Sequence, residues 1–117
     1  MVKIGNVEIS GPMTLAPMAG VTDFAFRAIC TELGAALTTT EMVSAKALCY
    51  GDNKTKSLLY NLPGCRPFAA QIFGHEPEIM AQAAPMAIEY SGADMLDINM
   101  GCPVGKICLL YTSPSPR

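Results

Sequence analysis

Strand-like and helix-like segments alternate along this chain, and the alternation restricts its fold more than any other feature. Four short apolar runs have the length of buried strands. They are residues 13–16, 35–40, 68–73 and 94–98. Helix-like segments separate them, at residues 24–33, 44–48 and 77–90. This order implies parallel strands joined by right-handed crossovers, with every carboxyl end at one edge, where α/β barrels and open α/β sheets build their sites.

The boundaries of these segments carry recognisable start and stop signals. Thr22 or Asp23 can cap the first helix, and Gly34 can end it in a left-handed conformation. Pro77 occupies the first turn of the last helix, where proline is tolerated. Pro85 lies about two turns further on and is expected to kink that helix. The caps and Pro77 support the helix assignments independently of the apolar spacing, whereas Pro85 breaks a local rule of helix formation.

The whole pattern predicts the N-terminal half of a (β/α)8 TIM barrel. Residues 2–9 alternate around Gly5-Asn6, which predicts a hairpin that serves as a lid or plug. Three complete strand-helix units and a fourth strand follow. Half of the 117 residues are hydrophobic and only 15% are charged, against about 25% in an average soluble domain. Much of the surface is therefore expected to be covered, as in a slice of a larger parallel-sheet protein.

Charge and cysteine content narrow the classes of partner. A net charge of −2 gives no sign of nucleic acid or an anionic membrane as a partner. The five cysteines are odd in number and form no C-x-x-C pair, so neither a disulfide framework nor a metal site is expected. The N-terminus lacks the apolar region of a signal peptide, and no run reaches membrane-spanning length. A cytoplasmic protein without a membrane segment is the expectation.

The end of the sequence does not fit the repeating pattern. A helix is expected after Pro103, yet the chain closes with Ser-Pro-Ser-Pro-Arg, which cannot form one. Residues 108–117 also resemble the translation of a sequencing-library adapter. We therefore expect a partial barrel domain at residues 1–107 and a non-native tail at 108–117. The alternative is a native disordered tail.

Cys102 follows the fourth strand and is a candidate proton donor. A lone cysteine is more often a small buried hydrophobe than a reactive group. Free thiols titrate near about pH 8.5, however, so a cysteine at neutral pH is mostly protonated and can act as a general acid. His75, which follows Gly74 at the head of a helix, is expected to cap that helix. A Cys-His hydrolase is therefore poorly supported.

Other strand ends carry residues suited to holding a flat ligand. Gln71 and Asn99 have amides that can read the edge of a heteroaromatic ring or satisfy loop backbone, and both alternatives stay open. Pro17-Met18-Ala19-Gly20 offers rigid backbone and little bulk, which suits a flat ligand or a plain turn. Glu41 can bind a donor or form a salt bridge.

Four of these stretches together resemble the tRNA-dihydrouridine synthases, specifically their bacterial B-type branch. The resemblance spans roughly residues 2–107. It is carried by residues 15–23 (LAPMAGVTD), Glu41-Met42, residues 71–74 (QIFG) and residues 97–103 (DINMGCP). It implies an FMN-dependent α/β barrel that reduces uridine to dihydrouridine in tRNA with electrons from NADPH. By position, Pro17, Met18 and Ala19 would hold the flavin, and Gln71 would hydrogen-bond its ring.

The resemblance also assigns roles toward the substrate. Asn99 would contact the target uracil, and Cys102 would protonate its C5 while reduced flavin delivers hydride to C6. A lysine and a histidine expected on later strands, the flavin-phosphate loops and the helical RNA-binding domain are not among the 117 residues. We therefore expect this stretch by itself neither to hold FMN tightly nor to modify tRNA. The motifs leave the oligomeric state and the target uridine open.

Two other functions compete with this interpretation. One is an FMN barrel of the dihydroorotate dehydrogenase kind, which also acts on a pyrimidine ring beside a thiol. Activity on a free pyrimidine rather than on tRNA would distinguish it. The other is a non-catalytic α/β module in which Cys102 is structural.

Overall fold

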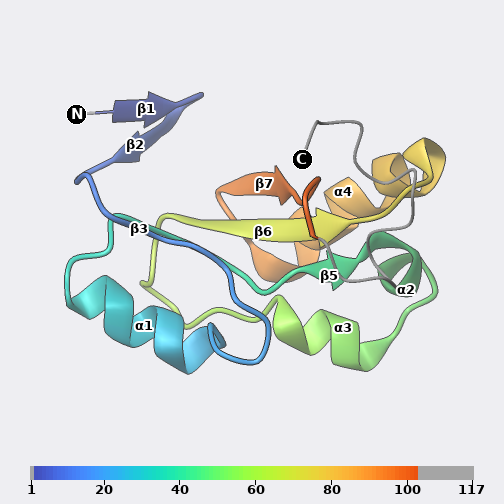
Figure 1. Cartoon of the computed structure of the whole chain (residues 1–117), viewed down its shortest axis with the longest axis horizontal. Coiled ribbons are helices and arrows are strands. Elements are labelled where there is room, and N and C mark those ends of the chain that lie inside the picture. The colour runs from blue at the N-terminus through green and yellow to red at the C-terminus, as the bar shows by residue number, and fades with distance from the viewer. Residues whose placement is uncertain (1, 103–117) are drawn as a thin grey trace.

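A computed structural model describes residues 2–102 of the chain and shows strands and helices in alternation (Figure 1). The strands are β1 (Val2–Ile4), β2 (Val7–Ile9), β3 (Thr14–Leu15), β4 (Leu37–Thr39), β5 (Val43–Ser44), β6 (Phe68–Phe73) and β7 (Met95–Ile98). The helices are α1 (Phe24–Glu32), α2 (Ala45–Cys49), α3 (Asn53–Leu58) and α4 (Pro77–Ser91). The tail predicted at residues 108–117 lies outside the described residues.

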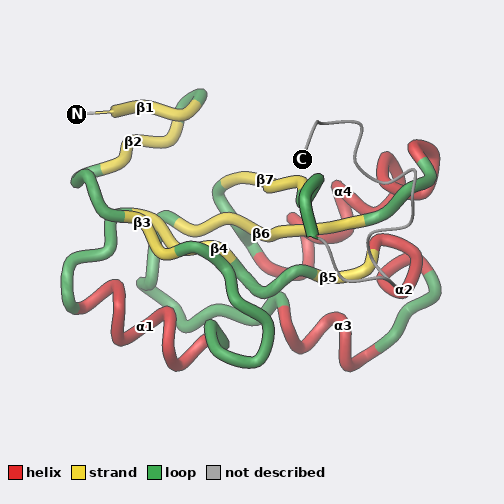
Figure 2. Tube along the Cα trace, viewed as in Figure 1, coloured by secondary structure: helices red, strands yellow, loops and turns green. Residues whose placement is uncertain are grey.

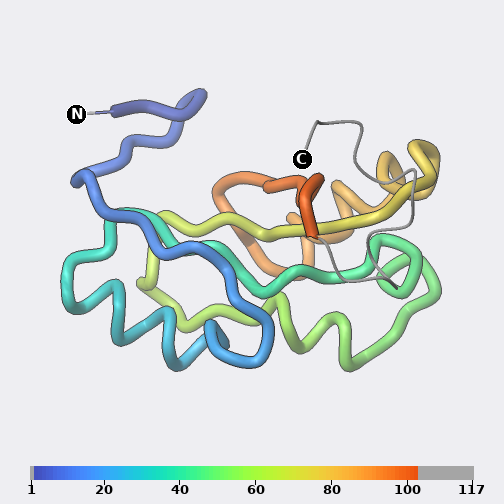
Figure 3. Tube along the Cα trace, viewed as in Figure 1, coloured from blue at the N-terminus to red at the C-terminus, as the bar shows by residue number. Residues whose placement is uncertain are grey.

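The main sheet is parallel, and its strands pair in the order of the sequence. β3 pairs with β4, β4 with β6, and β6 with β7, all in parallel. The chain colours of Figure 3 follow this order across the sheet. The predicted α/β class is confirmed, and the arrangement is compatible with one arc of a TIM barrel. The predicted hairpin is also confirmed, because β1 and β2 pair antiparallel.

β4 and β5 pair with successive parts of β6, and the segment between them contains one residue more than the facing segment of β6. Thr39 is the partner of Ala69, and Val43 is the partner of Ile72. The chain thus takes four steps, 39 to 43, opposite three steps, 69 to 72. This is the count of a β-bulge, a feature that often re-aims side chains beside active sites. The sequence pattern did not predict β5.

Thr40 completes the hydrogen bonding at this bulge. Its backbone N–H donates to the Ala69 carbonyl at 2.9 Å. Its hydroxyl oxygen accepts from the Gln71 backbone N–H at 3.0 Å, so a side chain replaces the lost ladder partner. The bulge carries Glu41 and Met42 to the carboxyl edge of the sheet.

Every residue of β6 except Phe73 is buried. Phe68, Ala70 and Ile72 belong to the hydrophobic core, together with Ala83 and Ala87 of α4. Because side chains alternate along a strand, Ala69 and Gln71 lie on the opposite face. Figure 2 shows α1 and α3 together on one side of the sheet. The small alanines allow α4 to approach the sheet closely.

Of the two predicted caps of α1, Thr22 and Asp23, the structure shows Asp23 as the N-cap. Its carboxylate accepts a hydrogen bond from the Phe26 backbone N–H at 2.8 Å, and Gly34 follows the helix with a φ of 104°. The buried residues of α1 are Arg27 and Ala28. The apolar Phe26, by contrast, is 40% exposed in the described structure.

Helix α4 begins at Pro77 as predicted, and Gly92 closes it with a φ of 67°. Pro85 lies inside this helix without ending it. The predicted capping role of His75 is wrong. The N-cap is Glu76, and the exposed His75 ring lies 3.6 Å from the Glu76 carboxylate.

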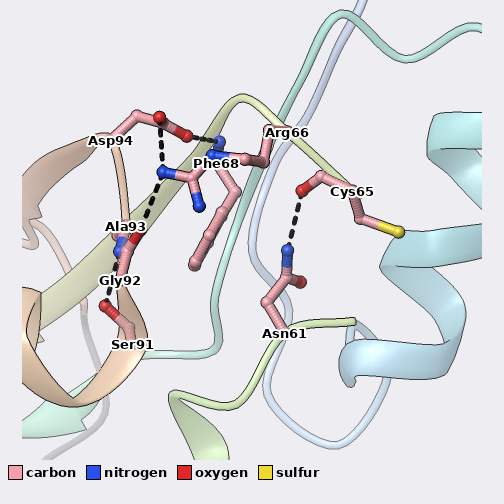
Figure 4. A network of polar contacts seen from close by, with 8 residues as sticks. All are labelled: Asn61, Cys65, Arg66, Phe68, Ser91, Gly92, Ala93 and Asp94. Atoms are coloured by element: carbon pink, nitrogen blue, oxygen red, sulfur yellow. Dashed lines mark hydrogen bonds and ion pairs between the residues drawn. The ribbon is translucent and has the colours of Figure 1, made fainter. Parts of the chain in front are cut away.

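A network at the amino ends of β6 and β7 fixes how these strands start (Figure 4). The Asp94 carboxylate accepts from the Phe68 backbone N–H at 2.9 Å and from the Arg66 guanidinium at 2.7 Å. The same guanidinium donates to the Gly92 carbonyl at 2.8 Å. The network joins the starts of the two strands, at the edge of the sheet opposite their carboxyl ends.

Asp52 is the N-cap of α3, a helix that the sequence pattern did not predict. Its carboxylate accepts from the Thr55 backbone N–H at 3.1 Å and from the Thr55 hydroxyl at 2.5 Å. These bonds, the hydroxyl first, lower the pKa of Asp52 below its usual value. None of the helices in residues 2–102 is long and apolar enough to cross a membrane.

Candidate functional site

A cavity of about 410 Å³ opens at the carboxyl edge of the sheet. Residues that follow β3, β4 and β7, with one from β6, line it: Pro17, Ala19, Met42, Gln71, Asn99, Met100, Gly101 and Cys102. Parallel strands bring these segments together although more than 80 positions of sequence separate the first from the last. The predicted convergence of the strand-end motifs is therefore present in the structure.

Five of the six residues predicted for the site line this cavity, and Met18 does not. The side chain of Met18 is 60% exposed. Its backbone instead organises the loop after β3: the Met18 carbonyl accepts from the N–H groups of Val21 and Thr22, both at 3.0 Å. The Thr22 hydroxyl in turn accepts from the Met18 N–H at 2.9 Å. Met18 thus shapes a turn whose neighbours Pro17 and Ala19 face the cavity.

Glu41 holds this loop from the side of the sheet. Its side chain is 7% exposed, and Oε1 accepts a hydrogen bond from the Gly20 backbone N–H at 2.5 Å. Of the two roles that the sequence left open, the structure shows Glu41 bound to a donor. A carboxylate that accepts from a backbone N–H makes a strong, charge-assisted bond.

Arg27 holds the other end of the loop from beneath. Its fully buried guanidinium donates to the carbonyls of Thr22 at 2.7 Å and Tyr60 at 2.6 Å, and to the Asn61 side chain at 3.3 Å. Burial lowers the pKa of Arg27, and the negative charge of Glu41 opposes that shift. Sequence reasoning missed this residue. The available signal was a charged side chain within an apolar helical segment.

A chain of side-chain hydrogen bonds links the exposed Asp97 to residues that line the cavity. The Asp97 carboxylate accepts from Gln71 Nε2 at 2.5 Å. Gln71 Oε1 accepts from Asn99 Nδ2 at 3.2 Å. Asn99 Oδ1 then accepts from the backbone N–H groups of Gly101 and Cys102, both at 3.1 Å. The chain connects β6, β7 and the loop that carries the thiol.

The sequence left two roles open for Asn99, and the structure shows the second one directly. Its oxygen satisfies loop backbone at Gly101 and Cys102. Its Nδ2 contacts Gln71 and lies 3.6 Å from the Met42 sulfur, a weak acceptor. The N–H directed at Met42 makes only a weak hydrogen bond, so it is the donor of Asn99 that is most easily redirected to a ligand.

Sequence reasoning did not assign Asp97 and Met42 to the site. Asp97 is a charged residue within a short strand, and it is the direct register partner of Gln71 on β6. Neighbouring partners of a parallel pair place their side chains on the same face. A charged residue at strand centre was the available signal, but its partner depended on the register.

The site combines a free thiol with small apolar surfaces and two side-chain amides. Cys102 is half-buried and its thiol is free. Pro17 and Ala19 add small apolar surfaces, while Gln71 and Asn99 supply amide donors and acceptors. In residues 2–102, no group of three or more histidine, cysteine or acidic side chains could hold a metal ion. The site is suited to a flat, polar-edged heterocycle beside a thiol.

The fold and site define a parallel α/β protein with a ligand pocket at its strand ends, and comparisons give the family. The model of the family described as Dihydrouridine synthase (Dus) matches residues 14–108, and the chain belongs to this family. It is 44% identical over 105 residues to a tRNA-dihydrouridine synthase B of Pasteurella multocida, covering 90% of the chain and 31% of the relative. To proteins of the same name it is 41% identical over 107 residues in Escherichia coli K12 and 40% over 108 residues in Pseudomonas aeruginosa.

The matched region covers most of this chain but a smaller part of the relatives. The match to the Escherichia coli protein covers 90% of the chain and 32% of that protein. The match to the Pseudomonas aeruginosa protein covers 92% of the chain and 32% of that protein. The chain therefore spans about a third of the length of the curated relatives it matches.

Proposed function

We propose that the chain is the N-terminal half of the (β/α)8 barrel of a longer enzyme, called the complete protein below, which reduces uridine to 5,6-dihydrouridine in tRNA. The convergence of Gln71, Asn99 and Cys102 on one cavity carries this proposal. Membership of the dihydrouridine synthase family and the names of the relatives support it. The remaining strands would close the barrel over the face of the sheet that carries Gln71.

The residues around the cavity fit the ring system of FMN. A volume of about 410 Å³ lies within the roughly 300–1,000 Å³ usual for small-molecule sites. Pro17 and Ala19 would lie against the ring, and Gln71 would hydrogen-bond its polar edge. Bound FMN, reduced by NADPH, would supply the hydride that adds to C6 of the uracil.

Asn99 and Cys102 act on the substrate in this proposal. The uridine leaves its stack in the tRNA to enter the cavity, because the thiol cannot reach a base inside a helix. Asn99 Nδ2 exchanges its weak contact with the Met42 sulfur for a uracil oxygen. Cys102 Sγ donates its proton to C5, and the resulting thiolate takes up a proton from water. The contacts with the FMN phosphate and most of those with tRNA belong to the rest of the complete protein.

Dihydrouridine content of cellular tRNA tests the proposal. The complete protein is expressed in a bacterial strain that lacks its own dihydrouridine synthases, and nucleosides of digested tRNA are measured by mass spectrometry. Dihydrouridine is expected with the native sequence. With Cys102→Ala, dihydrouridine is expected to form at least about 100-fold more slowly, since a positioned general acid accelerates a reaction by a factor of roughly 10²–10⁴. The variant is expected to keep its FMN.

Other results would support the competing functions. Turnover of a free dihydropyrimidine but not of tRNA would favour an enzyme of the dihydroorotate dehydrogenase kind. Unchanged dihydrouridine in Cys102→Ala would show that the thiol is structural. We also propose that residues 108–117 are not native, and an uninterrupted reading frame for them at the parent locus would contradict this.

A further inference from the structure

We propose that Asp97 is a positioning residue that fixes the orientation of the Gln71 side-chain amide, and with it the pattern of donors and acceptors facing the ligand. The hydrogen-bond geometry carries this inference by itself. The identity of the ligand as FMN rests on the proposed function. Asp97 does not line the cavity, so it acts through Gln71 and not on the ligand directly.

Register places the two side chains together. Gln71 of β6 and Asp97 of β7 are direct partners in the parallel ladder, with Ala69 and Met95 paired two residues earlier. Partners in register project from the same face of the sheet. The 2.5 Å contact between Gln71 Nε2 and Asp97 Oδ2 follows from this arrangement.

The carboxylate determines the direction of the whole hydrogen-bond chain. An ionised carboxylate only accepts hydrogen bonds, so Gln71 must turn its nitrogen toward Asp97. Gln71 Oε1 is then directed to Asn99 and must receive a donor, which is Asn99 Nδ2 at 3.2 Å. The Asn99 oxygen faces the N–H groups of Gly101 and Cys102, which hold that amide in the matching orientation. The carboxylate at one end of the chain of bonds and the two backbone donors at the other thus favour the same orientation of both amides.

The reversed orientation of Gln71 is disfavoured at both ends. It would place Oε1 against the Asp97 carboxylate, where two acceptors would meet. It would also place Nε2 against Asn99 Nδ2, where two donors would meet. The observed bond to Asp97 is charge-assisted and stronger than a bond between neutral groups. Gln71 therefore offers the ligand one lone pair of Oε1 and the second N–H of Nε2, an arrangement suited to a ring edge with both a donor and an acceptor.

NMR of the complete protein without FMN tests the inference independently of the ligand. The probes are the ¹⁵N side-chain resonances of Gln71 and the hydrogen-exchange rates of the Gly101 and Cys102 amides. Asp97→Ala is expected to shift the Gln71 signals and to speed exchange at both amides about tenfold. Asp97→Asn, which keeps the shape, should give a smaller change.

Asp94→Asn is the matched control, because Asp94 is hydrogen-bonded at the other end of the same strand. It is expected to lower the melting temperature while leaving the Gln71 side-chain signals and both loop amides unchanged. Unchanged Gln71 signals in Asp97→Ala would overturn the inference whether or not the protein binds flavin.

A double variant that exchanges the carboxylate and the amide between positions 71 and 97 distinguishes a positioning role of Asp97 from a merely structural one. In Asp97→Asn with Gln71→Glu, the carboxylate moves to β6 and can accept from residue 97 and from Asn99. Slow exchange at Gly101 and Cys102 is therefore expected to return, and continued fast exchange would contradict the proposed direction of the chain. The double variant still lacks the Gln71 N–H, so it is not expected to recover FMN binding.

Flavin binding gives the last measurement. Asp97→Ala is expected to weaken FMN binding about tenfold and to shift the visible absorption bands of the bound flavin. Asp94→Asn is expected to change neither the affinity nor the spectrum. A native protein that shows the expected NMR behaviour but binds no FMN would overturn the proposed function alone. A native protein that binds FMN, with an unaltered spectrum and affinity in Asp97→Ala, would overturn the inference alone.

Discussion

Glu41 Oε1 accepts a hydrogen bond from the Gly20 backbone N–H at 2.5 Å, which joins the β4–β5 bulge to the loop after β3. Arg27 donates to the Thr22 carbonyl at 2.7 Å and holds the other end of the same loop. The loop that presents Pro17 and Ala19 to the cavity is therefore fixed by two buried charged side chains. A loop held in place before binding loses little entropy when its ligand arrives.

Removing Glu41 should weaken FMN binding through this loop. Glu41→Ala is expected to raise the Kd of the complete protein for FMN by about 10- to 100-fold, because a hydrogen bond to a charged group contributes roughly 1.5–3 kcal/mol. Glu41→Gln keeps an acceptor oxygen and should lose less. Flavin fluorescence titration measures the affinity. Glu8→Gln on the exposed hairpin is the control, and equal affinities for Glu41→Ala and Glu8→Gln would contradict the loop-anchoring role.

Arg27 and Arg66 should differ sharply in their importance for stability. Arg27→Met leaves the Thr22 and Tyr60 carbonyls without their charged donor in a buried region and is expected to cost about 3 kcal/mol. The Arg66 side chain is 52% exposed in its ion pair with Asp94, and Arg66→Met is expected to cost no more than about 1 kcal/mol. Urea unfolding of the complete protein measures both. Comparable losses would show that the buried guanidinium has no special role.

The carboxylate of Asp52 should make α3 sensitive to acid. The bond from the Thr55 hydroxyl lowers the pKa of Asp52 in the folded state, so the ionised form stabilises the fold above the unfolded-state pKa. That contribution is lost as pH falls through the folded-state pKa, below about pH 4. The melting-temperature difference between the native protein and Asp52→Asn should hold constant from pH 7 to 5 and shrink below pH 4. A difference that grows toward low pH would contradict the assignment.

Local sequence signals predicted the elements that depend on neighbours in the chain. The cap at Asp23, the proline at the start of α4 and the glycine after α1 all act within one turn, and the structure shows them where they were expected. Thr40 shows the opposite case. Its hydroxyl serves a backbone N–H on β6, 31 residues away, so no local pattern could predict the bulge or β5.

The same distinction applies to the site. The strand-end motifs placed Gln71, Asn99 and Cys102 at one edge, because parallel topology alone brings the ends together. Which atoms bond depends on register and burial. The partner of Asp97 lies 26 residues away and that of Arg27 as many as 34, so the sequence could not assign either partner.

Thr38 and Thr40 should respond in opposite directions to the same substitution. Both are buried on one short segment, at 1% and 0% exposure. The Thr40 hydroxyl oxygen accepts from the Gln71 N–H, whereas the Thr38 hydroxyl finds no hydrogen-bond partner among the described residues. Thr40→Val leaves a buried N–H unpaired and is expected to cost about 1–3 kcal/mol. Thr38→Val removes an unpaired hydroxyl and is expected to stabilise the protein by about 1 kcal/mol.

Thermal and urea unfolding of the complete protein measure the two valine variants, and serine variants serve as controls. Thr40→Ser keeps the acceptor oxygen, so it should lose only the contribution of a methyl group, about 0.8 kcal/mol. Thr38→Ser keeps the unpaired hydroxyl and loses the methyl group, so it should be less stable than Thr38→Val. The Thr40 hydroxyl accepts the hydrogen bond of the Gln71 backbone N–H, so Thr40→Val should also weaken FMN binding. Thr38→Val should leave FMN binding unchanged. A Thr40→Val variant as stable as the native protein would show that the Thr40 hydroxyl does not hold the bulge, and a destabilised Thr38→Val would contradict the prediction for Thr38.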